Sequence, residues 1–220
     1  MKKNIMILMV FFCIGLIFVP ALAFGQNGTI RELSGTVEIR RPGQTGFIAA
    51  RQGDTISSDT IISTGFRSSA LIAVGSSMLT VRPLTVLTLT EIQSMSGTET
   101  INVNLQAGRV RVDVNPPAGT RANLDIHGPV ATASTRGTSF EFDTKTLTVY
   151  NGVVAFAGQR GGTMLVGAGS TSIITENSRA ADPIQVAITA LMPAPVTGSD
   201  TGLNHITPIV ELMEVTFWLP

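Results

Sequence analysis

The chain has 220 residues, with 15 acidic and 15 basic side chains, and 44% of its residues are hydrophobic. This balance excludes the strongly basic surface of nucleic-acid-binding proteins and gives no electrostatic attraction to an anionic membrane. The 22 glycines, against one tryptophan and one tyrosine, favour many short strands joined by tight turns over long amphipathic helices.

The first 23 residues are typical of a secretory signal peptide. Lys2 and Lys3 precede an apolar run from Ile5 to Val19, and Ala21-Leu22-Ala23 supplies the small residues at which such peptides are cleaved. An uncleaved anchor is the weaker interpretation, because the run is shorter than the roughly 20 residues that span a bilayer. We therefore predict an exported protein, periplasmic or secreted, whose mature chain begins at or near Phe24.

Cleavage would change what chemistry the chain can perform. The only cysteine, Cys13, lies in the predicted signal peptide, so the mature chain would have no thiol for a disulfide or a nucleophile. About 197 residues would remain, with 13 basic and 15 acidic side chains. That length is enough to bury a core without disulfides.

From Thr36 onward, apolar and polar residues alternate along most of the chain. This is the period of a sheet that buries one face, and prolines, glycines and polar turns interrupt it about every 8 to 12 residues. We count about twelve to fourteen short strands and predict an all-β fold, either a sandwich or a β-roll. A short irregular β-solenoid is the alternative, because no repeat of fixed length is visible.

The alternation is clearest from Asn123 to Ala157. Leu124 and Ile126 alternate with polar residues, Phe140 and Phe142 flank a glutamate, and a turn is expected at Asp143-Thr144-Lys145. Asn151-Gly152 is expected to close a β-hairpin, because Asn and Gly tolerate the positive φ of a type I′ turn.

Several motifs in this half resemble the FecR-type domain of bacterial periplasmic signalling proteins. They are Gly108–Val112, the R-G-T-S-F motif at Arg136–Phe140, Leu147–Val154 and Val166–Gly169, in the family's order. Asp59–Ile72, followed by Gly75-Ser76, resembles the family's first half, although Ser58 and Val74 stand where the family has glycine and aspartate. The resemblance covers about residues 35–175. Its structural motif residues here are Thr64, Gly65, Arg136, Gly137, Thr138, Phe140, Asn151 and Gly152.

The resemblance implies binding without catalysis. In the family, such a domain is commonly part of an anti-sigma regulator and contacts the signalling domain of an outer-membrane receptor. No cytoplasmic anti-sigma region precedes the signal peptide here, so we expect a stand-alone ligand- or protein-binding module. Its expected partner is an unidentified envelope protein or glycan, and self-association is possible. The alternatives are a structural or assembly protein of the cell envelope and a carbohydrate-active enzyme.

Arg136 has two interpretations. Between small residues and a Gly-Thr pair, it could be partly buried and hold turn carbonyls or a carboxylate together. It could instead recognise a carboxylate of a partner. The sequence favours the structural interpretation, because the motif resembles one found in proteins with different partners.

Catalytic patterns are not found. His127 and His205 are far apart and beside no cysteine or carboxylate cluster, so no metal or other cofactor is expected. No serine lies in a G-x-S-x-G motif, and the carboxylates are scattered as on a solvated sheet face. We expect the protein not to be an enzyme.

The composition changes after Glu176. Asp182-Pro183 predicts the start of one helix that continues to Met192, and a linker and the apolar segment Thr207–Pro220 follow. The segment either docks back on the domain or binds a partner through Phe217 and Trp218. The predicted organisation is a signal peptide (1–23), a β domain (24–179) and a C-terminal helix, linker and tail (180–220).

Overall fold

The structure is a computed structural model that describes residues 27–191. The predicted signal peptide with its cleavage site, and the tail with Phe217 and Trp218, lie outside the described residues. In the described part, no helix is long and apolar enough to cross a membrane.

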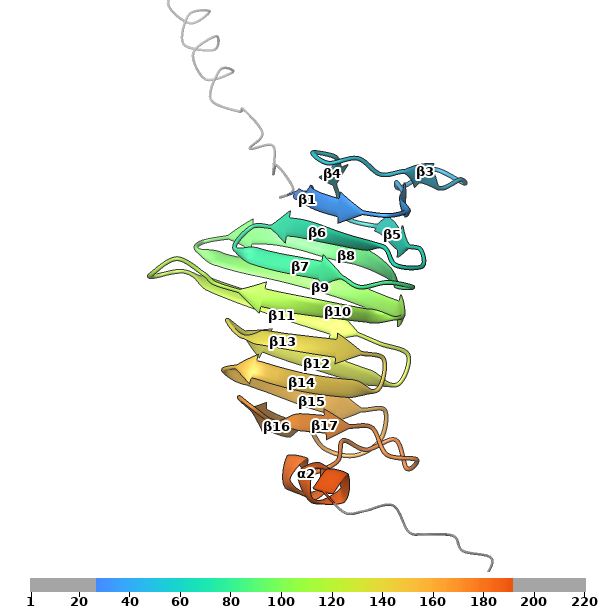
Figure 1. The fold of residues 1–220 in the computed structure, drawn as a ribbon. Helices are drawn as coiled ribbons and strands as arrows, with labels where there is room; N and C mark the ends of the chain where they lie inside the picture. Colours follow the sequence, from blue (N-terminus) through green and yellow to red (C-terminus); the bar gives the residue numbers. More distant parts are fainter. Residues whose placement is uncertain (1–26, 192–220) are drawn as a thin grey trace, which may run out of the picture.

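Two β-sheets face each other along the whole length of the molecule, with strands β1 and β4 at one end and α2 at the other (Figure 1). In spatial order, sheet A contains β17 (Thr171–Ile173), β14 (Thr146–Asn151), β13 (Ser139–Asp143), β10 (Arg109–Val114), β7 (Ser77–Val81), β6 (Ser69–Val74), β1 (Gly28–Ser34) and β4 (Thr55–Ile56). Sheet B contains β16 (Met164–Gly167), β15 (Val153–Gly158), β12 (Ala131–Arg136), β11 (Arg121–His127), β9 (Thr98–Ala107), β8 (Val86–Met95), β5 (Thr60–Thr64), β2 (Val37–Arg40) and β3 (Ile48–Ala49).

Along the sequence, the chain passes back and forth between the two sheets, usually after a hairpin of two strands. Hairpins such as β6–β7 and β13–β14 lie in sheet A, and β8–β9 and β11–β12 lie in sheet B. Apart from the parallel pair β9 and β11, whose intervening strand β10 lies in the other sheet, all described pairs are antiparallel. The predicted all-β fold is confirmed. The described part has seventeen strands, more than counted from sequence, because β3, β4 and β17 are only two or three residues long.

The core lies between the sheets and is built from the alternating apolar residues. On β13 of sheet A, Phe140 and Phe142 are fully buried while Glu141 between them faces outward. On β11 of sheet B, Leu124 and Ile126 are likewise fully buried in the core. The rings of Phe142 and Phe156 meet edge to face across the sheets, with centroids 6.0 Å apart. Each such side chain contributes about 1.5–3 kcal/mol by leaving water.

Asn151-Gly152 does not close a hairpin, contrary to the expectation from sequence. Strand β14 before it pairs with β13 and β17 in sheet A, and β15 after it pairs with β12 and β16 in sheet B. The pair is therefore a crossover between the sheets. Gly152 has a φ of 83°, so the positive φ that the sequence indicated is present, but it turns the chain into the opposite layer.

The predicted helix is confirmed as α2 (Pro183–Leu191). The Asp182 carboxylate accepts a hydrogen bond from the Ile184 N–H at 2.8 Å, which caps the N-terminus ahead of Pro183. Before the helix, the chain folds back along β17: the Ser172 hydroxyl donates to the Ala181 carbonyl, and the Ala181 N–H donates to the Ile173 carbonyl. Ala181 therefore bonds to the β domain although it lies two residues past 179, where the sequence predicted the domain to end. The domain boundary stays a prediction.

Candidate functional site

The R-G-T-S-F motif forms a corner where the chain passes from sheet B to sheet A. Arg136 ends β12, Gly137 has a φ of 79°, and Thr138 is buried just before β13. The Thr138 hydroxyl is hydrogen-bonded to that of Thr135, and the Thr138 carbonyl accepts from the Val114 N–H at 3.0 Å. The corner thereby satisfies polar groups that lie between the layers.

The Asn151-Gly152 crossover packs against this corner. A Cβ atom on Gly152 would lie 2.5 Å from the Thr138 methyl group, closer than such carbon atoms approach one another. Asn151 itself is exposed. The two motifs are thus in direct contact, and glycine at position 152 is needed for space as well as for backbone conformation.

Thr64 and Gly65 occupy a similar crossover near the other end of the molecule. The buried Thr64 hydroxyl donates to the Arg82 carbonyl at 2.6 Å and accepts from the Thr85 N–H at 3.0 Å. The Gly65 N–H donates to the Thr36 carbonyl at 2.9 Å. These residues hold backbone in place, and their polar groups face the protein.

Glu99 is a residue whose role the sequence analysis missed. Its side chain reaches from β9 in sheet B to the β6–β7 turn in sheet A, where its carboxylate accepts from the Ser76 N–H at 2.9 Å and from the Ser76 hydroxyl at 2.6 Å. This is the turn in which Val74 stands where the family has aspartate. Glu99 therefore holds this turn of sheet A from the opposite sheet.

Arg136 is exposed, which corrects the expectation of a partly buried side chain holding turn carbonyls. Among the described residues, its guanidinium has no hydrogen-bond partner and no carboxylate within 4.0 Å. The corner is held by Thr138 and Thr135 instead. Ala131, Ala133 and Thr135 are buried along β12, so the alternation of the strand places Arg136 on the outer face of sheet B. With no partner among the described residues, its five donors are available to another molecule.

A depression of about 600 Å³ surrounds Arg136 on the outer face of sheet B. Cross-strand pairing places Asn123 directly opposite Arg136, and Asp125 opposite Ser134 in the next row. Two exposed aliphatic side chains lie on one side of these polar groups, on the next two strands: Val153 on β15, with 53% of its surface accessible, and Leu165 on β16, with 69%. The other lining residues are Thr100, Thr135, Gly137, Thr138, Gly152 and Ala155.

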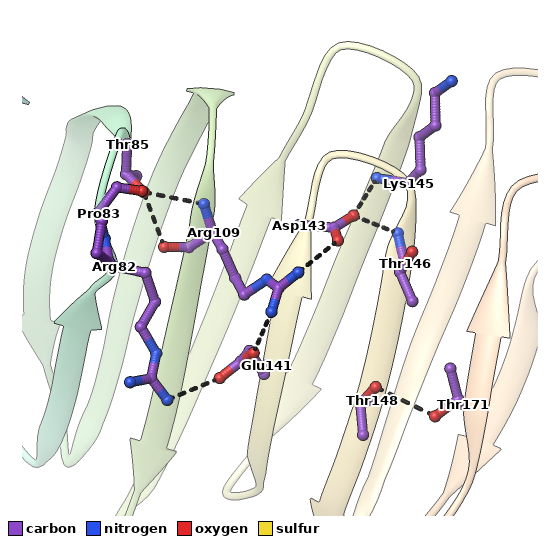
Figure 2. A network of polar contacts seen from close by, with 10 residues as sticks. All are labelled: Arg82, Pro83, Thr85, Arg109, Glu141, Asp143, Lys145, Thr146, Thr148 and Thr171. Carbon is purple, nitrogen blue, oxygen red and sulfur yellow. Dashed lines mark hydrogen bonds and ion pairs between the residues drawn. The ribbon is translucent and has the colours of Figure 1, made fainter. Parts of the chain in front are cut away.

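A network of charged residues covers the outer face of sheet A (Figure 2). Glu141 lies between Arg82, at 3.0 Å, and Arg109, at 3.2 Å, and Arg109 also reaches Asp143 at 3.5 Å. Asp143 in turn accepts from two backbone N–H groups of the β13–β14 turn. In this network the charges compensate one another across three strands, so it is arranged as a stabilising feature of the sheet.

Neighbouring Arg111 lies between Asp113 and Tyr150. Its Nε is 3.2 Å from Asp113, and its guanidinium stacks on the Tyr150 ring at 4.6 Å from the centroid. The hydrogen bond to Asp113 raises the pKa of Arg111 further above its ordinary value. Its charge is therefore permanent and already has a partner.

Clusters of metal-binding side chains are not found in residues 27–191. No three His, Cys, Asp or Glu side chains in this range lie close enough together to hold a metal ion. His127, on the outer face of sheet B, has only the Thr132 hydroxyl at 3.4 Å. Among the described residues, Asp125 is the only carboxylate that lines the Arg136 depression, so these residues do not form the acid pair of a glycosidase there.

Residues 60–155 match the family model described as FecR protein. The resemblance to the FecR family that the sequence predicted is confirmed over this range. This matched range runs from β5 to β15 and includes Thr64, Glu99, Arg136 and Gly152, which lie at the corners described above.

The comparison with solved structures gives only a weak likeness. Two structures of a candidate anti-sigma factor from Parabacteroides distasonis ATCC 8503, at 2.50 and 1.65 Å resolution, are each 14% identical to this chain with a TM-score of 0.45. The matches cover 58% and 59% of this chain, and 62% and 64% of that protein, less than two thirds of its length. No curated protein matches the chain.

Proposed function

We propose that the chain is an exported, non-catalytic binding module that recognises its partner through the Arg136 depression of its FecR domain. The observation that carries this proposal is the exposed Arg136 guanidinium, which has no partner in the described part and lies beside two exposed aliphatic side chains, Val153 on β15 and Leu165 on β16. Arginine beside exposed apolar groups is a typical combination at the centre of protein interfaces. A carboxylate on the partner would satisfy the guanidinium in a bidentate pair.

The charged network on sheet A fits a binding role less well. Arg82, Arg109 and Arg111 already face carboxylates, and a partner would have to break those pairs before using the arginines. On sheet B, Arg136 faces the neutral Asn123. The depression on sheet B therefore offers recognition without loss of an existing ion pair.

The proposed location outside the cytoplasm rests on the N-terminal sequence. N-terminal sequencing of the protein from the envelope fraction and the medium is expected to begin at or near Phe24. Recovery of an intact Met1 from the membrane would instead show that the first 23 residues anchor the protein, and the proposal of a released module would be rejected.

The binding face is tested by capture from envelope extract, followed by competition with the purified partner. The immobilised chain is expected to retain an envelope protein or glycan, and Arg136→Glu and Leu165→Asp to reduce retention at least tenfold. Arg31→Glu is the matched control, because Arg31 is an exposed arginine on β1 at the far end of the molecule. Equal retention by all variants would show that the partner binds elsewhere.

Self-association is a second candidate, favoured by the edge of sheet B. Strand β16 is the last strand of that sheet and carries the exposed Leu165, so its outer backbone groups could pair with a strand of a second copy. Gel filtration coupled to light scattering distinguishes this case. A dimer that Val166→Pro converts to monomer would support edge pairing, and a monomer at all concentrations would exclude it.

A further inference from the structure

We infer that a segment of the same chain, Ile209–Trp218, docks in the Arg136 depression and competes with the outside partner. The inference rests on the proposed function, because both place a ligand in the Arg136 depression of sheet B. It goes further by naming one ligand, a segment of this chain.

Charge is the first argument for this occupant. Residues 192–220 contain three carboxylates, Asp200, Glu211 and Glu214, and no lysine or arginine. Residues 27–191 contain 13 basic and 12 acidic side chains. Arg136 is an exposed cation of that part with no carboxylate within 4.0 Å among the described residues, so an acidic segment is complementary to it.

The spacing of apolar residues is the second argument. The pairing of Ser134 with Ala155, and of Ala155 with Leu165, places Leu165 two strands and two residues from Arg136, about 12 Å between Cα atoms. In an extended segment, side chains four residues apart project from the same face, about 13 Å apart. Trp218 follows Glu214 at this spacing. A carboxylate on Arg136 would thus bring an aromatic ring over Leu165.

The connecting segment, residues 192–208, is long enough for this docking. Helix α2 ends at Leu191 on the side of the molecule where β16 and β17 end the sheets (Figure 1). Arg136 lies on β12, third from that end of sheet B, about 15 Å away at the usual strand spacing. The 17 residues from 192 to 208 can span up to about 56 Å.

The basic groups on sheet A are a poorer match for the same segment. Arg82 and Arg109 lie 3.0–3.5 Å from Glu141 and Asp143, and a further carboxylate would meet those two acids as well (Figure 2). Asp125 lines the Arg136 depression, but no carboxylate of the described residues lies within 4.0 Å of Arg136. The structure therefore favours the Arg136 depression over the Arg82–Arg109 network as the docking face.

Trp218 provides the test, because it is the only tryptophan in the chain. Its fluorescence is measured in the intact chain and in a synthetic peptide spanning Thr207–Pro220. In the intact chain we expect emission at shorter wavelength and at least twofold less quenching by iodide than in the peptide. Arg136→Glu and Glu214→Arg are each expected to restore the peptide's values, and combining the two substitutions to return those of the unmodified chain.

The controls separate docking from other causes. Glu214→Arg lies outside the β domain, so its effect cannot arise from unfolding of the sheets, and Arg31→Glu is expected to change nothing. Peptide-like Trp218 emission from the intact chain, or Trp218 emission that Arg136→Glu does not change, overturns the inference. Emission that responds to Ile188→Asp on α2 instead of Arg136→Glu also overturns it. A change of the emission on dilution would indicate docking on a second copy and overturns it as well. If Arg136 variants lose the outside partner while Trp218 is unaffected, the proposed function stands and only this inference fails.

Discussion

Glu99 and Ser76 lie in opposite sheets, and the Glu99 carboxylate accepts both the backbone N–H and the hydroxyl hydrogen bond of Ser76. Hydrogen bonds to an ionised acceptor are about twice as strong as neutral ones. Glu99 is 7% exposed, and its second oxygen lies against Gly75 without a hydrogen-bond partner among the described residues. The contact therefore connects the two layers at the end of a hairpin and depends on the absence of a side chain at Gly75.

We predict that Glu99→Ala lowers the free energy of unfolding by about 1–3 kcal/mol, because Ser76 loses a buried acceptor. Gly75→Ala should cost about 2 kcal/mol, since a Cβ there would lie 1.2 Å from the Glu99 oxygen and the residue has a φ of 53°. The double variant should lose less stability than the sum of the losses in the two single variants. Urea unfolding checks this, with exposed Glu38→Ala as the control; full additivity would mean that the two residues do not interact.

Gly152→Ala tests the contact between the two family motifs. A Cβ at this position would meet the Thr138 methyl group at 2.5 Å, whereas one at Gly169 would meet nothing within 4 Å. Both glycines have similar positive φ values, 83° and 75°, so Gly169→Ala reports the backbone strain alone. We expect Gly152→Ala to destabilise the domain by about 1–2 kcal/mol more than Gly169→Ala in thermal or urea unfolding. Equal losses would refute a steric role for Thr138.

Arg136→Ala should change the free energy of unfolding by less than about 0.5 kcal/mol, because the side chain is exposed and bonded to nothing in the described part. The sequence alone favoured a loss of about 1–3 kcal/mol, as for a partly buried arginine. A loss above about 1 kcal/mol in urea unfolding would restore that structural role and weaken the proposed binding face.

Glu141→Gln should destabilise sheet A modestly and in a salt-dependent way. The substitution leaves Arg82 and Arg109 without the carboxylate between them, although both arginines are about half exposed, so we expect a loss of about 0.5–1.5 kcal/mol at low ionic strength. In 1 M salt the Debye length falls to about 3 Å and the loss should shrink by about half. Glu38→Gln, at an exposed site without an ion pair, is the control. A loss that is independent of salt would show that packing, not charge, is what Glu141 contributes.

The parts of the fold that were predictable are those with local causes. The alternation at Phe140 and Phe142 identifies the buried face of a strand whichever sheet it joins, and Asp182-Pro183 marks a helix start from adjacent residues. Asn151-Gly152 shows the limit: its positive φ suits a hairpin and a crossover equally well, and the choice depends on which strands pair. A local pattern does not contain that information.

The site was harder to predict because it depends on contacts between distant residues. Glu99 meets a turn 23 residues earlier in the chain, so no local pattern around Ser76 indicated this contact. For Arg136, the small neighbours that suggested burial are the residues that form the corner, and the alternation of β12, which buries Ala133 and Thr135, places the arginine on the outer face. The exposed Leu165, two strands away, joins it only through the order of strands in sheet B.

Site-specific photo-crosslinking in the native cells tests the central claim most directly. A photoreactive phenylalanine analogue replaces Leu165 beside Arg136, or Leu71 on the outer face of sheet A as the control. The account predicts one defined adduct from position 165, with an envelope partner or with residues 209–218 of the same chain, that Arg136→Glu abolishes and that position 71 does not give. No adduct from position 165, or the same adducts from both positions, would contradict it.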